Sequence, residues 1–524
     1  MYREVSEMKK LLALLLSALL AAALCLPGAA ADGVGAVRTG QALSVDGRSV
    51  SCDVYNIGGS NYFKLRDVAA LLTGTGSQFD VDYNADTRAI TLTPGAAYTP
   101  DPATDLVIGE DRSASAKEST QAVRMGGGLV SGLSAYNIGD NNYFQLRQLG
   151  VMLGFGVDYD SATRTMLVTS STPERPYAPQ EINFAETVTF AQRQAVGGIT
   201  ADVLTVNVRN PRVHVRSCMV DDTVAARAPF ADIVARAAGA VAVITGNFMD
   251  GTASGPLYPV GTVMCGGELR YIGGTFSALG ITDRGEVRVG RPSIRVRMNP
   301  TDRQCIWYNA VGVNMPEAQQ AEQLSVLYTP AYGASFGVSY AGCVTVVSGG
   351  KVTAYGAVGP GDRTAIPADG FVLLMSDTYM GYIPAGQYVA PAVGEGMELE
   401  YYLYRPDEEG FTLDGVTQII GGGPRLVKDG APCTELEPQF SDRTRFADSV
   451  SSSRTAVGVT AEGRLIFLST AAATIPQLRE AMLALGCEDA FNLDGGASTA
   501  LWYGGAVYRA PSRDLATTVQ IYVD

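Results

Sequence analysis

Alternation of apolar and polar residues is the main pattern in the C-terminal part of the chain. Val203–Arg209 and Val213–Arg216 alternate with a period of two, which is typical of half-buried strands. Continuous apolar runs, typical of buried strands, occur at Val241–Ile244 and Leu465–Leu468. Helical spacing occurs at Phe230–Ala238 and Ile475–Leu485. We therefore predict that residues 183–524 form one large, sheet-rich α+β domain with two packed helices.

The N-terminal part contains an internal repeat. Tyr55–Arg66 and Tyr136–Arg147 agree at nine of twelve positions. Each copy continues into a helix-like stretch and closes with strand patterns, at 81–92 and 157–168. Two hairpins and a helix per copy predict a small α+β module. The expected boundaries are repeat 1 at 32–95, a polar linker at 96–123, repeat 2 at 124–170 and a proline-rich linker at 171–182.

These copies resemble the copper amine oxidase N-terminal-like, or stalk, module of exported bacterial proteins. The resemblance rests on the Tyr-Phe-x-Leu-Arg turn, the helix and the Val-Asp-Tyr strand. It implies a spacer or wall-associated module and implies no copper. The repeated Tyr-Phe pairs have two possible roles, stacking against sugars or packing in the core, and core packing is the more frequent role of such pairs.

The first residues have the three parts of a secretory signal. Basic Met8-Lys9-Lys10 precedes the apolar run Leu11–Leu24 and the small-residue segment Pro27–Ala31. We expect cleavage near Ala31 and a secreted or cell-surface protein. No second long apolar stretch follows, so no transmembrane segment is expected after cleavage.

Charge and rare residues exclude several function classes. The net charge of −14 becomes −15 without residues 1–31, which argues against nucleic-acid binding. His214 is the single histidine, so multi-histidine metal sites are excluded, and its alternating flanks favour a structural role in a strand. The seven cysteines after the signal show no C-x-x-C spacing, and their odd number leaves at least one unpaired.

Four stretches share one form, in which an apolar strand is followed by glycine, amide and charged residues. They are 244–251, 419–430, 453–458 and 492–499. In the last stretch Asp494 stands at a strand end, and the two glycines after it allow a tight turn and close approach of a ligand. Each stretch alone is a weak signal, whereas their order and spacing together are more specific.

In that order the stretches resemble the phosphodiester glycosidase family over residues 190–524. The resemblance implies an exported hydrolase that cleaves the bond between a sugar anomeric carbon and phosphate in a cell-wall or extracellular polysaccharide. It implies Asp494 as nucleophile or base, Asn492 as a positioning residue and Arg454 as a bidentate phosphate clamp. Further expected site residues are Asn247 and Asp250 on the opposite wall, Thr245, the close-approach glycines Gly422, Gly423, Gly495 and Gly496, and the hydrogen-bonding Ser498 and Thr499. Arg425 is expected to face solvent.

Three departures from the family pattern keep a second function open. Thr245 stands where the family has asparagine, Ser469–Ala473 stands where it has Asp-Gly-Arg, and its closing motif is shortened to Arg509–Asp514. The alternative is a non-catalytic surface protein that binds glycans. No cofactor is required, although calcium or magnesium bound by Asp494, Asp250 and backbone oxygens is compatible with the sequence.

Overall fold

The computed structural model describes residues 34–170, 182–251, 256–274, 276–302, 308–321, 324–441 and 444–524. The chain divides into two compact units, Met1–Gln180 and Glu181–Asp524. The expected signal segment, nearly all of the proline-rich linker and Cys305 lie outside the described residues. Among the described residues, no helix has both the length and the apolar character needed to cross a membrane.

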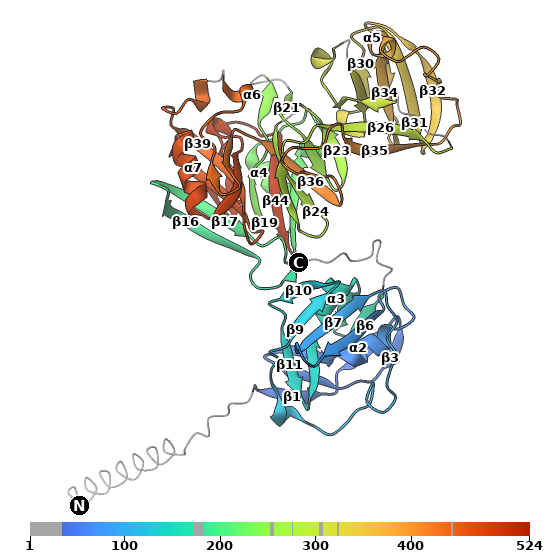
Figure 1. Ribbon diagram of the computed structural model, residues 1–524, viewed down its shortest axis with the longest axis vertical. Coiled ribbons are helices and arrows are strands. Elements are labelled where there is room, and N and C mark those ends of the chain that lie inside the picture. The colour runs from blue at the N-terminus through green and yellow to red at the C-terminus, as the bar shows by residue number, and fades with distance from the viewer. Residues whose placement is uncertain are drawn as a thin grey trace, which may run out of the picture. The chain divides into compact units, whose positions relative to one another are not determined.

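In the N-terminal unit both sequence copies have the same order of elements (Figure 1). The first copy contains β2 (Ala42–Val45), β3 (Arg48–Val50), β4 (Val54–Ile57), β5 (Ser60–Lys64), α2 (Leu65–Leu72), β6 (Phe79–Asn84) and β7 (Ala89–Pro94). The second contains β9 (Ala122–Met125), β10 (Gly128–Ser131), β11 (Ala135–Ile138), β12 (Asn141–Gln145), α3 (Leu146–Leu153), β13 (Gly156–Asp160) and β14 (Thr165–Thr169). Each copy thus has three hairpins rather than the two expected, because the strands of the first hairpin are too short to give a clear pattern.

The two copies share their sheets. The hairpins β4–β5 and β11–β12 join in one sheet because β5 pairs with β12, and β1 (Ala36–Thr39) and β8 (Lys117–Glu118) form its edges. Strand β7 runs parallel to β9, and β14 runs parallel to β2. The repeated Tyr-Phe pairs lie in the core, where Tyr62, Phe63, Tyr143 and Phe144 are all buried. Core packing therefore explains these pairs.

The segment expected to be a linker at 96–123 is folded into this unit. Buried Asp105 accepts a hydrogen bond from the Tyr98 hydroxyl at 2.7 Å, and the Leu106 N–H donates to Asp67 at 2.9 Å. Lys64 lies 2.9 Å from the same Asp67 carboxylate. Buried charges need such partners, so the packing of repeat 1 holds the segment in place. The expectation of a loose linker was wrong.

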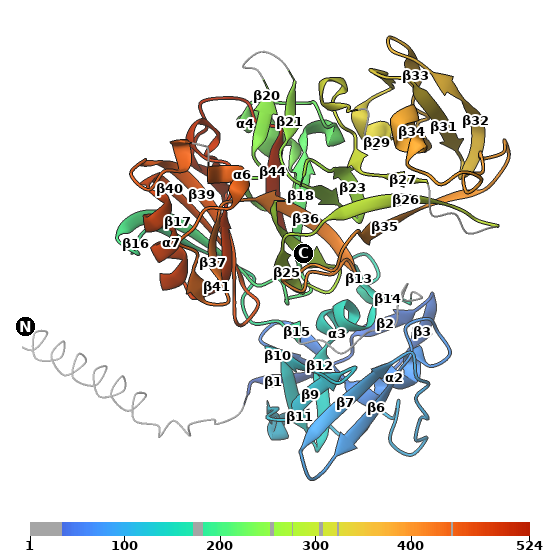
Figure 2. The same ribbon diagram turned by 45° about the horizontal axis from the view of Figure 1, so that its top comes forward.

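Three sheets surround one core in the C-terminal unit (Figures 1 and 2). The first has the order β16 (Val188–Val196), β17 (Ile199–Val206), β40 (Leu465–Ala473), β39 (Ser452–Thr460), β41 (Cys487–Asn492), β37 (Arg425–Lys428) and β38 (Ala431–Pro432). The second has the order β18 (Val213–Met219), β44 (Thr517–Val523), β19 (Ala240–Thr245), β42 (Leu501–Tyr503) and β43 (Ala506–Arg509). The third has the order β23 (Glu268–Tyr271), β22 (Val263–Cys265), β36 (Val416–Gly422), β24 (Ser277–Thr282) and β25 (Val287–Gly290). One cluster of buried residues joins all three, with Phe491, Ile244 and Ile420 among its members.

Helices cover this core at two places. Helix α7 (Ile475–Ala484) begins at Thr474, whose side chain and that of Gln477 form a capping box. Its buried residues pack against the first sheet, and α4 (Phe230–Arg236) packs beside β19. Both helices lie where the periodicity predicted them. Two short helices, α5 (Asp377–Gly381) and α6 (Pro438–Ser441), add to the predicted pair.

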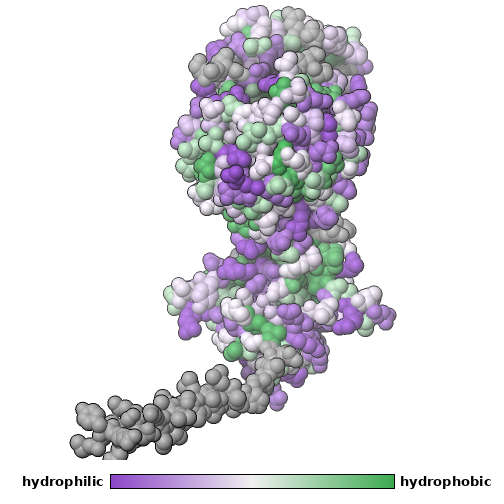
Figure 3. All heavy atoms as spheres, turned by 90° about the vertical axis from the view of Figure 1, so that its left-hand side faces the viewer, coloured by the Kyte–Doolittle hydropathy of each residue, from purple (hydrophilic) through white to green (hydrophobic). Residues whose placement is uncertain are grey.

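The middle of this unit forms a lobe, seen in yellow in Figure 1, set apart from β16–β19. It is built from β26 (Ile294–Pro300), β27 (Asn309–Ala310), β28 (Gly312–Val313), β29 (Ser325–Tyr328), β30 (Ser335–Gly337), β31 (Gly342–Ser348), β32 (Lys351–Val358), β33 (Arg363–Ala365), β34 (Gly370–Ser376) and β35 (Met397–Leu403). The face of the C-terminal unit seen in Figure 3 intersperses hydrophilic and hydrophobic residues, as water-exposed surfaces do. The described chain is sheet-rich with few helices, as expected.

Candidate functional site

The four stretches picked out in the sequence meet where their strands end. The first and second are joined because the Gly421 N–H donates to Asn247 Oδ1 at 3.3 Å. The first and last are joined because the Asp494 N–H donates to the carbonyl of Gly246 at 3.3 Å. Residues separated by more than 200 positions in sequence thus share one small region of the fold.

The remaining two junctions close the arrangement. The Gly423 N–H donates to the Asn492 carbonyl at 2.7 Å, which joins the second stretch to the last. The Leu493 N–H donates to the Thr455 carbonyl at 2.8 Å, which joins the third stretch to the last. Strand β41, which leads into the last stretch, lies between β39 and β37 in the first sheet. Residues 492–499 are therefore central to the group, as their sequence suggested.

Asp494 is the buried carboxylate of this region, 7% exposed. Its Oδ1 accepts from the Gly495 N–H at 2.9 Å, and its Oδ2 accepts from Arg513 Nη2 at 3.0 Å. Arg513 Nε donates at 2.6 Å to the hydroxyl of Ser498, which is itself fully buried. Burial raises the pKa of Asp494 above the ordinary range, while the Ser498 hydroxyl and the Arg513 guanidinium act in the opposite direction.

Arg513 is the site residue that the sequence did not reveal. Its side chain is 40% exposed, so it reaches from Asp494 to solvent. It lies in an irregular segment between β43 and β44, where no strand or helix pattern points to it. The one feature of the sequence that could have pointed to Arg513 is its position in the shortened closing motif Arg509–Asp514.

Asn492 lies beside Asp494 with one polar atom unused. Its Nδ2 donates to the carbonyls of Gly423 at 3.1 Å and Leu493 at 2.8 Å. Its Oδ1 is buried and has no hydrogen-bond partner in the described part of the chain, and the same holds for the hydroxyl of Thr499. Buried acceptors are nearly always bonded, so these atoms are candidates for contact with a bound molecule or water.

The glycines of the site serve close packing within the protein. A Cβ on Gly422 would lie 2.7 Å from the Asn492 carbonyl oxygen, and one on Gly495 would lie 2.8 Å from the Ser453 carbonyl oxygen. Gly423, with φ of +146°, packs against the ring of Phe440. Gly496 has φ of +57° and is exposed, so it alone of the four combines a glycine-requiring conformation with access to solvent.

The side chains of Thr245 and Asn247 in the first stretch bond to backbone groups and do not line the site. The Thr245 hydroxyl donates to the Ser498 carbonyl at 2.6 Å and accepts from the Ala500 N–H at 2.8 Å. Asn247 is buried, and its Nδ2 donates to the Thr262 carbonyl at 3.0 Å. These two side chains position the loop around Asp494. Asp250 is exposed on β20 (Met249–Gly251), which pairs with β21 (Leu257–Pro259).

Arg454 is buried among backbone carbonyls. Its Nη2 donates to the carbonyls of Arg445 at 2.8 Å and Val450 at 3.2 Å, and its Nε donates to Ala473 at 3.3 Å. Burial, with the neighbouring Arg445, lowers the pKa of Arg454. The structure thus places this guanidinium where it orders the segment 445–450.

Arg425 is buried, and the expectation that it faces solvent was wrong. Its Nη2 donates to Asp489 at 2.6 Å and lies 3.1 Å from Glu409. Its backbone N–H donates to the Glu437 carboxylate at 2.7 Å. The neighbouring Pro424 suggested an exposed turn. The residue instead begins β37, where three carboxylates from distant segments surround it.

The region does not fit a divalent cation. No group of three or more His, Cys, Asp or Glu side chains suited to a metal exists within the described ranges. Asp494 Oδ2 already accepts from a guanidinium, and a second cation at that oxygen would be repelled. Asp250 is exposed on a separate hairpin.

Comparison with known proteins shows that part of the chain is similar to one family of enzymes. The model of the phosphodiester glycosidase family matches residues 341–522, which supports a glycosidase-like hydrolase at family level. The match contains Gly422, Arg454 and Asp494. The first stretch, with Thr245, Asn247 and Asp250, lies outside it.

Three solved structures are similar to this chain to different extents. A hypothetical protein from Synechocystis is similar over 93% of this chain and 99% of its own, with TM-score 0.52 and 20% identity, which shows a shared fold. A Burkholderia pseudomallei protein described as exported has TM-score 0.47 and 20% identity over 62% of this chain and 74% of its own. The catalytic domain of zebrafish N-acetylglucosamine-1-phosphodiester alpha-N-acetylglucosaminidase, auto-inhibited by its pro-peptide, has TM-score 0.32 and 14% identity over 64% of this chain and 83% of its own. No curated protein matches the chain.

Proposed function

We propose that the protein is an exported hydrolase that cleaves the bond between a sugar anomeric carbon and phosphate in a sugar phosphodiester. Its substrate would be part of a cell-wall or extracellular polysaccharide, and the stalk-like repeats would associate with the wall. The observation that carries the proposal is the meeting of four distant stretches around buried Asp494. The family match at residues 341–522 supports it.

The proposed chemistry uses a carboxylate, an amide and a guanidinium. Cleavage of a glycosyl bond passes through an oxocarbenium-like transition state, which a carboxylate stabilises as nucleophile or base. Asp494 takes that role, and burial keeps it away from competing water. Asn492 Oδ1 accepts from a sugar hydroxyl. The exposed part of Arg513 binds the departing phosphate, a role first assigned to Arg454, which instead positions the segment 445–450.

The test is turnover of diesters by the full chain. We would measure sugar release from p-nitrophenyl and UDP-type α-sugar-1-phosphate diesters, comparing the native chain with Asp494→Asn. The amide keeps the shape and loses the charge, so we expect a fall in kcat of about a hundredfold or more. Asp232→Asn, an exposed carboxylate change on α4, is the matched control and should leave turnover unchanged. Full turnover by Asp494→Asn would disprove the role.

A second function has its own supporting observation. Both carboxylate oxygens of Asp494 are already bonded within the protein, and both hydrogen-bonding capacities of the Thr245 hydroxyl are in use. Groups that are already bonded within the protein suit a non-catalytic module that binds glycans. Binding of the diester without turnover by the native chain would favour this alternative, and multiple turnover would exclude it.

A further inference from the structure

The two repeats of the N-terminal unit are related by an internal two-fold. Strands β5 and β12 pair antiparallel with Phe63 opposite Phe144, and these two residues occupy equivalent places in the repeat. The pairs on either side, Lys64 with Tyr143 and Tyr62 with Gln145, exchange under the same relation. The parallel pairs β7 with β9 and β14 with β2 are exchanged as well. Each backbone junction of the two repeats therefore has an equivalent junction elsewhere in the unit.

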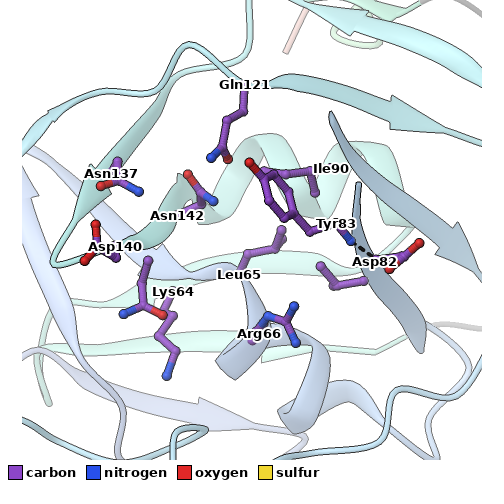
Figure 4. Close-up of a pocket in the computed structure, with 12 residues that line it drawn as sticks. Lys64, Leu65, Arg66, Asp82, Tyr83, Ile90, Gln121, Asn137, Asp140 and Asn142 are labelled. Atoms are coloured by element: carbon purple, nitrogen blue, oxygen red, sulfur yellow. Dashed lines mark hydrogen bonds between the residues drawn. The ribbon is translucent and has the colours of Figure 1, made fainter. Parts of the chain in front are cut away.

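A pocket of about 280 Å³ lies at one such junction (Figure 4). Repeat 1 supplies Arg66 at the start of α2 and Tyr83 from β6, and repeat 2 supplies Asp140 and Asn142 from the β11–β12 hairpin. Figure 4 shows the Tyr83 ring projecting across the pocket, with its hydroxyl end toward Gln121 and Asn142. The apolar residues of the lining are Leu65, Val81 and Ile90.

A second pocket of about 230 Å³ is the counterpart of the first. All of its lining residues are repeat equivalents of residues in the first pocket, with the roles of the repeats reversed. Arg147 corresponds to Arg66, Tyr159 to Tyr83 and Asn61 to Asn142. The remaining equivalences are Gly59 with Asp140, Ser60 with Asn141, Gln145 with Lys64, Leu146 with Leu65 and Met166 with Ile90.

The tyrosines of these pockets differ from the other repeated aromatic residues. Tyr83 is 40% exposed and Tyr159 is 44% exposed, whereas Tyr62 and Tyr143 are buried in the core. In both copies the preceding aspartate accepts the tyrosine N–H, at 2.8 Å for Tyr83 and 2.7 Å for Tyr159. Packing in the core accounts for the buried pair, whereas the exposed pair lies opposite Ile90 and Met166 in its hairpins and keeps one ring face toward solvent.

The polar groups of the first pocket suit a neutral ligand rich in hydroxyls. Gln121 Oε1 is buried and has no hydrogen-bond partner among the described residues. The lining has two basic side chains, Lys64 and Arg66, and two carboxylates, Asp82 and Asp140, so its formal charge is zero. An aromatic face with amide groups and balanced charge offers stacking to a sugar ring and hydrogen bonds to its hydroxyls.

We propose that the two pockets are a pair of binding sites for neutral sugar units of a polysaccharide. Each site uses the exposed tyrosine as its platform, Tyr83 in one and Tyr159 in the other. The amide groups and the neighbouring arginine provide the hydrogen bonds. The two sites bind the same polysaccharide at the same time, so the affinity of the pair exceeds the weak affinity of each site alone. This inference is independent of the diester hydrolysis proposed for the C-terminal unit.

The test is binding of defined sugars by the full chain. Titration calorimetry would use a tetramer of N-acetylglucosamine, and electrophoresis through gels containing neutral dextran would report on polymer. Tyr83→Ala and Tyr159→Ala should each weaken polymer binding by about tenfold, and the double variant should abolish it. Tyr382→Ala, which removes an exposed tyrosine of the C-terminal unit, is the matched control and should bind as the native chain does.

Thermal unfolding of each variant would verify folding, and Tyr→Phe at the same positions should keep most of the binding. The proposal is overturned if neither neutral probe binds the native chain at millimolar concentration. It is overturned equally if the double Ala variant binds like the native chain, or if only an anionic polymer such as polyglutamate binds. Asp494→Asn should bind both probes normally, which separates this test from that of the hydrolase.

Discussion

The contact between Arg513 and Asp494 allows a quantitative test of the candidate site. Arg513→Gln removes a charge-assisted hydrogen bond to a buried carboxylate, worth about 1.5–3 kcal/mol, and a bond to the Ser498 hydroxyl worth about 1 kcal/mol. Because the arginine side chain is 40% exposed, solvent screening reduces the sum. We expect the free energy of unfolding of the C-terminal unit to fall by about 2 kcal/mol near neutral pH.

The pH dependence of this loss follows from the raised pKa of Asp494. Since the pKa is higher in the folded than in the unfolded state, the stability associated with this carboxyl is fully present below the unfolded pKa and is lost as pH rises through the folded pKa. Arg513 limits that loss by favouring the ionised form. The variant should therefore lose stability more steeply than the native chain as pH rises, and the two should differ least under acid conditions.

Urea denaturation followed by tryptophan fluorescence is a suitable assay, because both tryptophans, Trp307 and Trp502, belong to the C-terminal unit. Arg464→Gln, which removes a surface pair with Glu186, is the matched control and should cost about 1 kcal/mol at most. In the double variant with Asp494→Asn, the cost of Arg513→Gln should fall to about 1 kcal/mol, because no buried charge is left unpaired. An equal loss at acid and neutral pH, or strict additivity of the two changes, would refute the reasoning.

Two further predictions concern neighbouring groups of the C-terminal unit. The Cys218 thiol, hydrogen-bonded to Cys265, lowers the pKa of Cys265, whereas burial raises the pKa of Cys487, so iodoacetamide should label Cys265 at a lower pH than Cys487. Mass spectrometry of the labelled peptides across a pH series would show this, and equal labelling of both thiols at every pH would contradict it. Gly422→Ala places a Cβ 2.7 Å from the Asn492 carbonyl oxygen, so we expect urea denaturation to show a loss of about 1–3 kcal/mol in the free energy of unfolding. The control Gly356→Ala, where a Cβ meets no atom within 4 Å, should lower that free energy by about 0.5 kcal/mol or less. Equal losses in the two variants would show that the backbone at Gly422 shifts to accept the Cβ.

Local pattern was enough to predict several strands and both main helices of the C-terminal unit. Period-two alternation located β17 and β18, apolar runs located β19 and β40, and helical spacing located α4 and α7. These signals are local because the side-chain period of a strand or helix is set by its own backbone. The order of apolar strand, glycine and polar residue likewise singled out the four stretches that meet around Asp494.

The partners of each polar side chain were decided by tertiary structure. Arg425 and Arg454 look alike in sequence, yet three carboxylates surround the first and backbone carbonyls surround the second. Arg513 reaches Asp494 from a segment without pattern. A charged side chain becomes buried only where distant segments supply its partners, and sequence periodicity does not encode which segments those are.

The N-terminal unit shows the same division. The repeat in the amino-acid sequence was enough to predict two similar modules, each with its helix and its Tyr-Phe pair. The fold settles three further features: the modules share sheets, the segment 96–123 is bonded to buried Asp67 of repeat 1, and Tyr83 and Tyr159 are exposed at matching pockets. The physical reason is that pairing of strands far apart in the chain depends on the burial of whole faces, which becomes defined when both copies are folded together.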